Sequence, residues 1–252
     1  MRSSINLIVT VLLLAVVSFA IDFNELFSFR GHIKMQNLLV CICIAFFSLL
    51  LSSLRFGLLN RSFGIVETWR RTHRLNVLSV CYSLIAVPTV AQIIGRLRHA
   101  DTDRPEVLVS VSIIEKVISG GLLLLISFSL AYYEFGKSVF PAEIFLAALL
   151  LLVLAVFFGL IGCKAFFPNS ELSRFKETVR AVFALSYIPA VVCSFLMHVA
   201  IIFGYIVIAL SFESSLSIAT LASGFSLVVL ATAMPIGFGG WGVREASAAG
   251  VF

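Results

Sequence analysis

Seven apolar windows, separated by short charged segments, run along the chain and predict membrane helices. A helix needs roughly 20 apolar residues to cross the hydrocarbon layer. The sixth window is longer than a bilayer requires, so its part before Pro189 is expected at the interface. The windows are Ser3–Ile21, Met35–Leu54, Leu75–Gly95, Val107–Ala131 (interrupted by two charges), Ile144–Cys163, Ala181–Phe212 and Ser214–Val243.

Composition supports a membrane protein. Of the 252 residues, 60% are hydrophobic and 12% charged, with a mean hydropathy of +1.10. A soluble domain is nearer half apolar and a quarter charged. We therefore predict an all-α polytopic integral membrane protein, with residues 1–252 as a single transmembrane domain. About six to seven hydrophobic helices are expected, with one or two re-entrant segments.

The first window has two interpretations. Arg2 followed by an apolar run, with Ser18-Phe19-Ala20 at its end, is typical of a cleaved signal peptide. The run is longer than a usual signal core and further apolar windows follow, which favours a retained first helix.

The five cysteines lie in apolar runs and include no CxxC pair. This pattern favours small buried side chains over a disulfide framework or a zinc site. No metal or cofactor is expected. The basic residues lie in short loops, so the net charge of +5 indicates membrane orientation and no nucleic-acid partner.

Lysine and arginine in the loops predict which side faces the cytoplasm. The segments Arg55–Arg74 and Lys164–Arg180 are both rich in basic residues, so both should be cytoplasmic. If every window crossed the membrane, an odd number of crossings would separate these two segments, and one of the two segments would be external. The conflict disappears if Leu75–Gly95 enters the membrane and returns, a path that Pro88 and Gln92 suit. The alternative is a true crossing with an imperfect charge rule.

The re-entrant path fixes the remaining topology. The N-terminus and the segment around Arg96 would be cytoplasmic, and the segments near Lys137 and Glu213 external. The spacing from Pro88 to Arg96 resembles that from Pro235 to Arg244. Opposite entry of these two elements would make an inverted repeat, which many transporters use, although chance similarity explains two spacings equally well.

The most distinctive stretch is Pro235-Ile-Gly-Phe-Gly-Gly-Trp-Gly-Val-Arg-Glu245. Proline interrupts a helix, and glycines allow backbone conformations that expose N–H groups. These groups and Arg244 would form an anion site, and Trp241 suits the membrane interface. A tight interhelical loop with a basic anchor is an equal alternative.

Glu115 and Lys116 interrupt an apolar window. A charge at the bilayer centre is costly, so such residues usually face a cavity or a partner. Neighbours on a helix point about 100° apart, so each needs another partner, and Arg96 or Arg244 would neutralise Glu115. The alternative is a helix that begins near Val117 and leaves both charges at the interface.

Other residues give weaker signals. His198 is interpreted as an interhelical hydrogen-bonding residue, with a proton relay as the alternative. The segment Arg55–Arg74, with Phe63 and Trp69, would lie on anionic lipid or be a solvated loop. The chain has no HExxH, GxSxG or P-loop motif.

The proline–glycine–arginine stretch resembles the P-x-x-x-G-G-x-G-x-R-E hallmark of the lysylphosphatidylglycerol synthase transmembrane (flippase-like) family. Pro88, Arg96 and the Glu115–Lys116 pair are similar to that family's earlier element. Two departures stand out: Thr89–Ile94 lacks the glycine-rich turn, and lysine replaces the arginine of a Glu-Arg pair.

The resemblance implies a multi-pass cytoplasmic (inner) membrane protein of a bacterium or archaeon that handles anionic or isoprenoid lipids. Some members move an aminoacylated phospholipid made by an attached domain. This chain is expected to lack that domain and to be truncated at its C-terminus. We therefore expect a lipid flippase-like protein without an enzymatic activity. The alternatives are an accessory subunit or membrane enzyme of lipid-linked cell-envelope glycan synthesis, and an inactive fragment.

The expected partners are membrane lipids, with a glycosyltransferase or lipid-modifying enzyme as a further protein partner. Two groups of residues are expected to act on the lipid. The headgroup-binding group is Arg244, Glu245, Gly239, Gly240, Gly242 and Trp241, and the polar-path group is Pro88, Arg96, Glu115, Lys116 and Pro235.

Overall fold

The computed structural model describes residues 35–85, 88–100, 105–136, 187–212, 216–233 and 247. All regular structure in these ranges is helical, which confirms the predicted all-α class. The helices are α3 (Met35–Ser62), α4 (Trp69–Ile85), α5 (Pro88–His99), α6 (Pro105–Phe135), α9 (Ile188–Ser211) and α10 (Ile218–Ala233).

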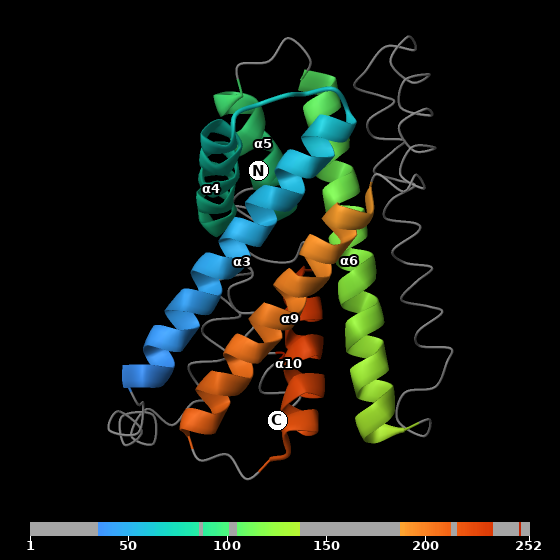
Figure 1. Ribbon diagram of the computed structural model, residues 1–252. Helices are drawn as coiled ribbons and strands as arrows, with labels where there is room; N and C mark the ends of the chain where they lie inside the picture. Colours follow the sequence, from blue (N-terminus) through green and yellow to red (C-terminus); the bar gives the residue numbers. More distant parts are fainter. Residues whose placement is uncertain are drawn as a thin grey trace, which may run out of the picture.

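Three of these helices are long and apolar enough to cross a membrane: α3, α6 over Val107–Phe135, and α9. They run the length of the bundle in Figure 1, with α3 directed opposite to α6 and α9. Phe46 and Leu39 on α3 are 65% and 55% exposed, as expected of a surface that lipid solvates. The second, fourth and sixth windows are therefore correctly predicted as helices, whereas Ser3–Ile21 and Ile144–Cys163 lie outside the described residues.

Two predicted boundaries are wrong. Helix α3 does not end at Leu54 but continues to Ser62, because Phe56 and Leu59 are fully buried in the core. Arg55 is therefore a helical residue inside the bundle and not part of a cytoplasmic loop. Helix α6 begins at Pro105, so the alternative start near Val117 is also wrong, and Glu115 lies well inside the helix.

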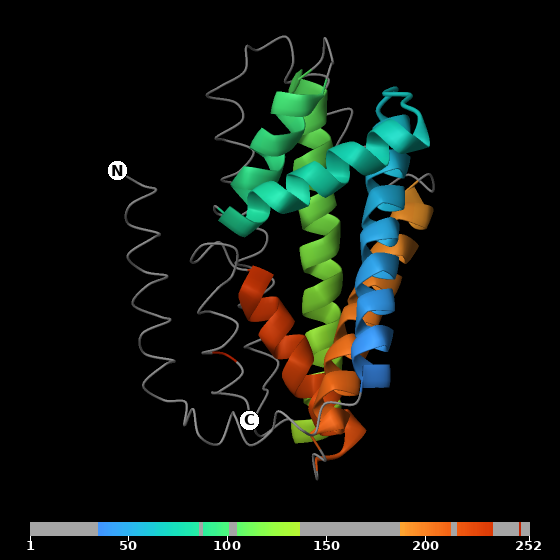
Figure 2. The ribbon, with the colours of Figure 1, turned by 90° about the vertical axis from the view of Figure 1, so that its left-hand side faces the viewer.

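The third window forms two helices, α4 and α5, that pack against each other as a hairpin. In Figures 1 and 2 both open ends of the hairpin lie where α3 ends and α6 begins, which we call the hairpin end of the bundle. The α4–α5 segment therefore begins and ends at the same end of the bundle, as the re-entrant prediction requires. Which side faces the cytoplasm stays a prediction.

Gly95 sets how closely the two arms of the hairpin approach. A Cβ atom at Gly95 would lie 3.0 Å from the Tyr82 ring and 3.2 Å from the Cα of Ser79. The backbone at Ser79 cannot move aside as a flexible side chain would, so the glycine permits the close packing of α4 on α5.

We expect Gly95→Ala to lower the free energy of unfolding by about 1–2 kcal/mol, because overpacking outweighs the gain in helix propensity. Thermal unfolding in detergent measures this. The matched control is Gly204→Ala, where the new Cβ would make an ordinary 3.4 Å contact with Ile44. That variant should be neutral or slightly more stable. Equal losses in both variants would contradict the close-packing argument.

Hydroxyl groups connect α6 to α10. Ser127 donates a hydrogen bond to the Ser226 carbonyl, and Ser223 donates one to the Leu130 carbonyl, both at 2.9 Å. Such small side chains allow membrane helices to approach closely. Helix α10 ends at Ala233, before Pro235, so the second element of the predicted inverted repeat lies outside the described residues.

Candidate functional site

Three charged side chains meet inside the bundle, one each from α3, α5 and α6. Arg55 and Arg96 both donate to the Glu115 carboxylate, each to a different oxygen, with 2.6 Å between Arg96 Nη1 and Oε2. The side chains of Arg55, Arg96 and Glu115 are only 3%, 1% and 1% exposed. We call these three residues the buried triad. Its members are 19 to 60 residues apart in the sequence.

The hairpin positions Arg96. Its Nη1 also donates to the Ser112 hydroxyl on α6, and its Nη2 donates to the Asn76 side-chain carbonyl on α4, each at 3.0 Å. Its guanidinium carbon lies 4.0 Å from the centre of the Phe56 ring on α3, a cation–π contact. Arg96 is therefore held by three helices and has little freedom to move.

Arg55 is also held by α9. Its Nη1 donates to the Ser194 hydroxyl at 3.2 Å. The Nε groups of Arg55 and Arg96 are buried and have no hydrogen-bond partner among the described residues. A buried donor without a partner is unfavourable, and these two N–H groups of the triad lack an acceptor among the described residues.

Lys116 adds a third positive charge beside the triad. It is half-buried, and its Nζ donates to the side-chain carbonyl of Gln92 on α5. Among the described residues, these three cations face the single carboxylate of Glu115, which leaves a formal excess of two positive charges within this part of the chain. Glu115 lies ten residues into α6, or ~15 Å along the helix from the hairpin end, so this excess is inside the span.

A second polar contact joins α6 to α9. His198 is 4% exposed, and its Nε2 lies 2.9 Å from the Ser119 hydroxyl and 3.0 Å from the Ser119 carbonyl. This is the interhelical hydrogen bond that the sequence predicted. The Nδ1 atom has no partner among the described residues.

The structure thus brings Arg96, Glu115 and Lys116 together, as three of the five predicted polar-path residues. Pro88 begins α5, eight residues before Arg96, so it starts the returning arm of the hairpin. Pro235 lies outside the described residues, and so does the predicted headgroup-binding group, namely Arg244, Glu245, Gly239, Gly240, Gly242 and Trp241.

Sequence reasoning named Arg96 as a partner of Glu115 but missed Arg55. One signal was available: Arg55 is followed by Phe56-Gly57-Leu58-Leu59, an apolar run that continues the helix. An arginine between two apolar runs is placed within the helix and not beyond its end. Asn76 and Ser194 carried no comparable signal, because small polar residues are common in membrane helices.

Comparison with known proteins identifies the family. No curated protein and no solved structure matches the chain. A family model described as "Lysylphosphatidylglycerol synthase TM region" matches residues 4–252, and the chain therefore belongs to this family of membrane proteins.

Proposed function

We propose that the protein binds the anionic headgroup of a lipid inside the membrane and moves the lipid between leaflets. The observation that carries this proposal is the buried excess of positive charge around Glu115. Buried charges are stable only when they are compensated, and among the described residues one carboxylate faces Arg55, Arg96 and Lys116. A lipid phosphate supplies the missing negative charge.

The geometry of the free donors supports the same ligand. Arginine recognises phosphate through several N–H groups in one plane, and the Nε groups of Arg55 and Arg96 are without partners among the described residues. In this proposal Glu115 orients the two guanidinium groups, and the headgroup binds to the N–H groups that Glu115 leaves free.

The glycine-rich stretch from Pro235 to Glu245 would form a second part of the lipid path. Its proposed role rests on the sequence alone: exposed backbone N–H groups at Gly239 and Gly240, with Arg244, would hold the headgroup at another depth. Arginine-rich segments near the hairpin end place that end in the cytoplasm in this proposal, with the protein in the cytoplasmic membrane.

Lys116 offers a direct test because it contributes charge without belonging to the triad. We expect Lys116→Met to reduce the rate of anionic lipid transfer about tenfold, equivalent to ~1.4 kcal/mol of lost interaction. Unfolding should be little changed, because Gln92 is the one partner of Lys116 Nζ among the described residues. The measurement is the transfer of a fluorescent phosphatidylglycerol between leaflets of reconstituted vesicles.

Two controls make the test specific. Lys116→Arg keeps the charge and should keep most of the transfer rate, and Arg98→Gln removes an exposed charge from the end of α5. Wild-type transfer by Lys116→Met, or an equal loss in Arg98→Gln, would contradict a headgroup role for the buried charges. A fluorescent phosphatidylcholine, which has no net charge, should not distinguish Lys116→Met from the wild-type protein.

A further inference from the structure

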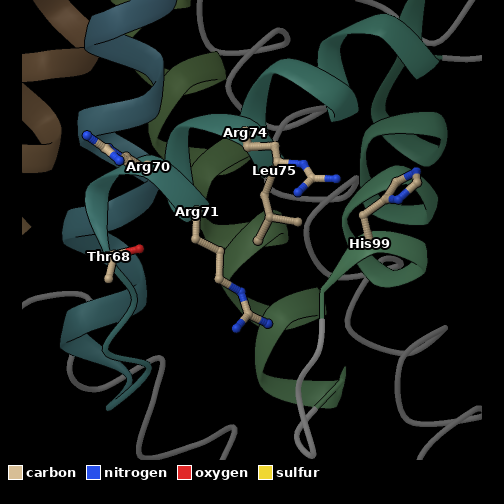
Figure 3. Close-up of a pocket in the computed structure, with 6 residues that line it drawn as sticks. All are labelled: Thr68, Arg70, Arg71, Arg74, Leu75 and His99. Atoms are coloured by element: carbon tan, nitrogen blue, oxygen red, sulfur yellow. The ribbon is translucent and has the colours of Figure 1, made fainter.

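A second basic site, separate from the buried triad, lies at the hairpin end. It is a pocket of about 480 Å³ between the start of α4 and the end of α5. Figure 3 shows Arg71 and Arg74 projecting from α4 on the side where His99 of α5 lies, whereas Arg70 points away from His99. The pocket is lined by Thr68, Arg70, Arg71, Arg74, Leu75 and His99.

The charges of this pocket are only partly compensated. Arg71 is paired with Glu67, four residues earlier, with 3.3 Å between Nε and Oε1. Burial raises the pKa of the Glu67 carboxyl above its usual value, and the neighbouring Arg71 opposes this rise. Among the described residues around the pocket, Glu67 is the one acidic residue that forms an ion pair. Arg70 and Arg74 are exposed and have no salt bridge among the described residues. Counted over the residues that the structure describes, the lining of the pocket is therefore net positive.

The backbone adds donors to the same pocket. Helix α4 begins at Trp69 and has no acidic residue in its first turn. Its first hydrogen bond runs from Thr72 N to Thr68 O, so the N–H groups of Trp69 and Arg70 have no acceptor within the helix. A helix N-terminus combined with arginine side chains favours a phosphate group.

Residues that line the pocket are neighbours in the sequence of residues that contact the triad. Leu75 is 2% exposed, and the next residue, Asn76, accepts the hydrogen bond from Arg96. His99, on the pocket wall, is one turn beyond Arg96 on α5 and lies 3.3 Å from the Tyr82 hydroxyl through its Nε2. The two basic sites therefore share both arms of the hairpin.

We propose that this pocket is a second anion site, which binds a phosphate group at the membrane surface. The phosphate belongs to a lipid headgroup or to a soluble phosphate ester, since both present the same oxygens to the arginines. This binding is independent of lipid movement through the buried triad. The two proposals can therefore fail separately.

The test measures binding of two probes to the full chain. Inorganic phosphate binding to purified protein in detergent is followed by equilibrium dialysis, and retention of phosphatidic acid is followed in nanodiscs. We expect the double variant Arg71→Gln/Arg74→Gln to weaken binding of the preferred probe at least about tenfold, as loss of charge-assisted hydrogen bonds implies. Arg98→Gln, which removes an exposed charge from α5 outside the pocket, should change binding less than about twofold.

Each outcome decides one question. Preferential retention of phosphatidic acid identifies a lipid source for the phosphate, and tighter binding of inorganic phosphate identifies a soluble one. Wild-type binding by the double variant overturns the proposal, and so does an equal loss in Arg98→Gln, which would indicate diffuse adsorption to an anionic surface. Because Arg74 is exposed, we expect the double variant to fold. Size-exclusion elution and helical circular dichroism check this.

Discussion

Replacing Glu115 with alanine is expected to lower the free energy of unfolding by about 3–5 kcal/mol. Two arginines share this carboxylate, and both are almost completely buried. Removing it leaves Arg55 and Arg96 as uncompensated charges in a low-dielectric interior, which is among the most destabilising single changes known in protein cores. Denaturant or thermal unfolding in detergent micelles measures the loss.

The matched control is Glu67→Ala, which also removes a glutamate that pairs with arginine. In that pair the Glu67 side chain is 10% exposed but Arg71 is 41% exposed, so the arginine that remains is solvated, and we expect a loss of about 0–1 kcal/mol. If both variants lost the same stability, burial would not be the reason for the effect at Glu115. If neither lost stability, the charges of the triad would be solvated, and the proposed headgroup site would lose its main support.

Adding Arg55→Met to the Glu115→Ala variant should restore part of the lost stability. The single variant contains two unpaired guanidinium groups, and the second substitution removes one of them and replaces it with an apolar side chain. Residues in one charge network commonly couple by 0.5–3 kcal/mol, and we expect about 2 kcal/mol here. The same unfolding measurement on both single variants and the double variant gives the coupling energy.

Arg55→Met alone should cost less than Glu115→Ala, because Glu115 keeps its contact with Arg96. The control for the rescue is Arg61→Met, an exposed arginine on the same helix, which should not stabilise Glu115→Ala. A double variant that is less stable than Glu115→Ala would show that Arg55 contributes through packing and not through its charge.

The hairpin shows how far charge patterns predict a membrane fold. Counting basic residues in loops predicted that Leu75–Gly95 returns to the side it entered, and α4 and α5 follow that path. The prediction rests on the cost of moving arginines across a bilayer, which acts on the whole segment. It does not depend on the exact contacts that the helices make. The close approach of the two arms, by contrast, depends on the absence of a side chain at Gly95.

The triad shows where sequence reasoning ends. Glu115 was recognisable because a carboxylate inside an apolar window requires a partner, and Arg96 was a correct candidate. Arg55 lay outside a hydrophobic window that ended at Leu54, and the apolar run after it indicated that the helix continues but not what Arg55 contacts. Its burial depends on the approach of α9, which supplies Ser194 from a point 139 residues further along the chain. Tertiary contacts of that separation leave no local pattern.

The shared carboxylate also has a consequence for how the protein is made. Arg55 and Arg96 both precede Glu115 in the sequence, so a ribosome delivers the two cations to the membrane before their common counter-charge. Neither can settle at its final depth until α6 has been synthesised. The hairpin is therefore expected to wait at the membrane surface and to enter only after α6 is inserted. In a nascent chain stalled before residue 115, α4 and α5 should remain accessible to water-soluble reagents.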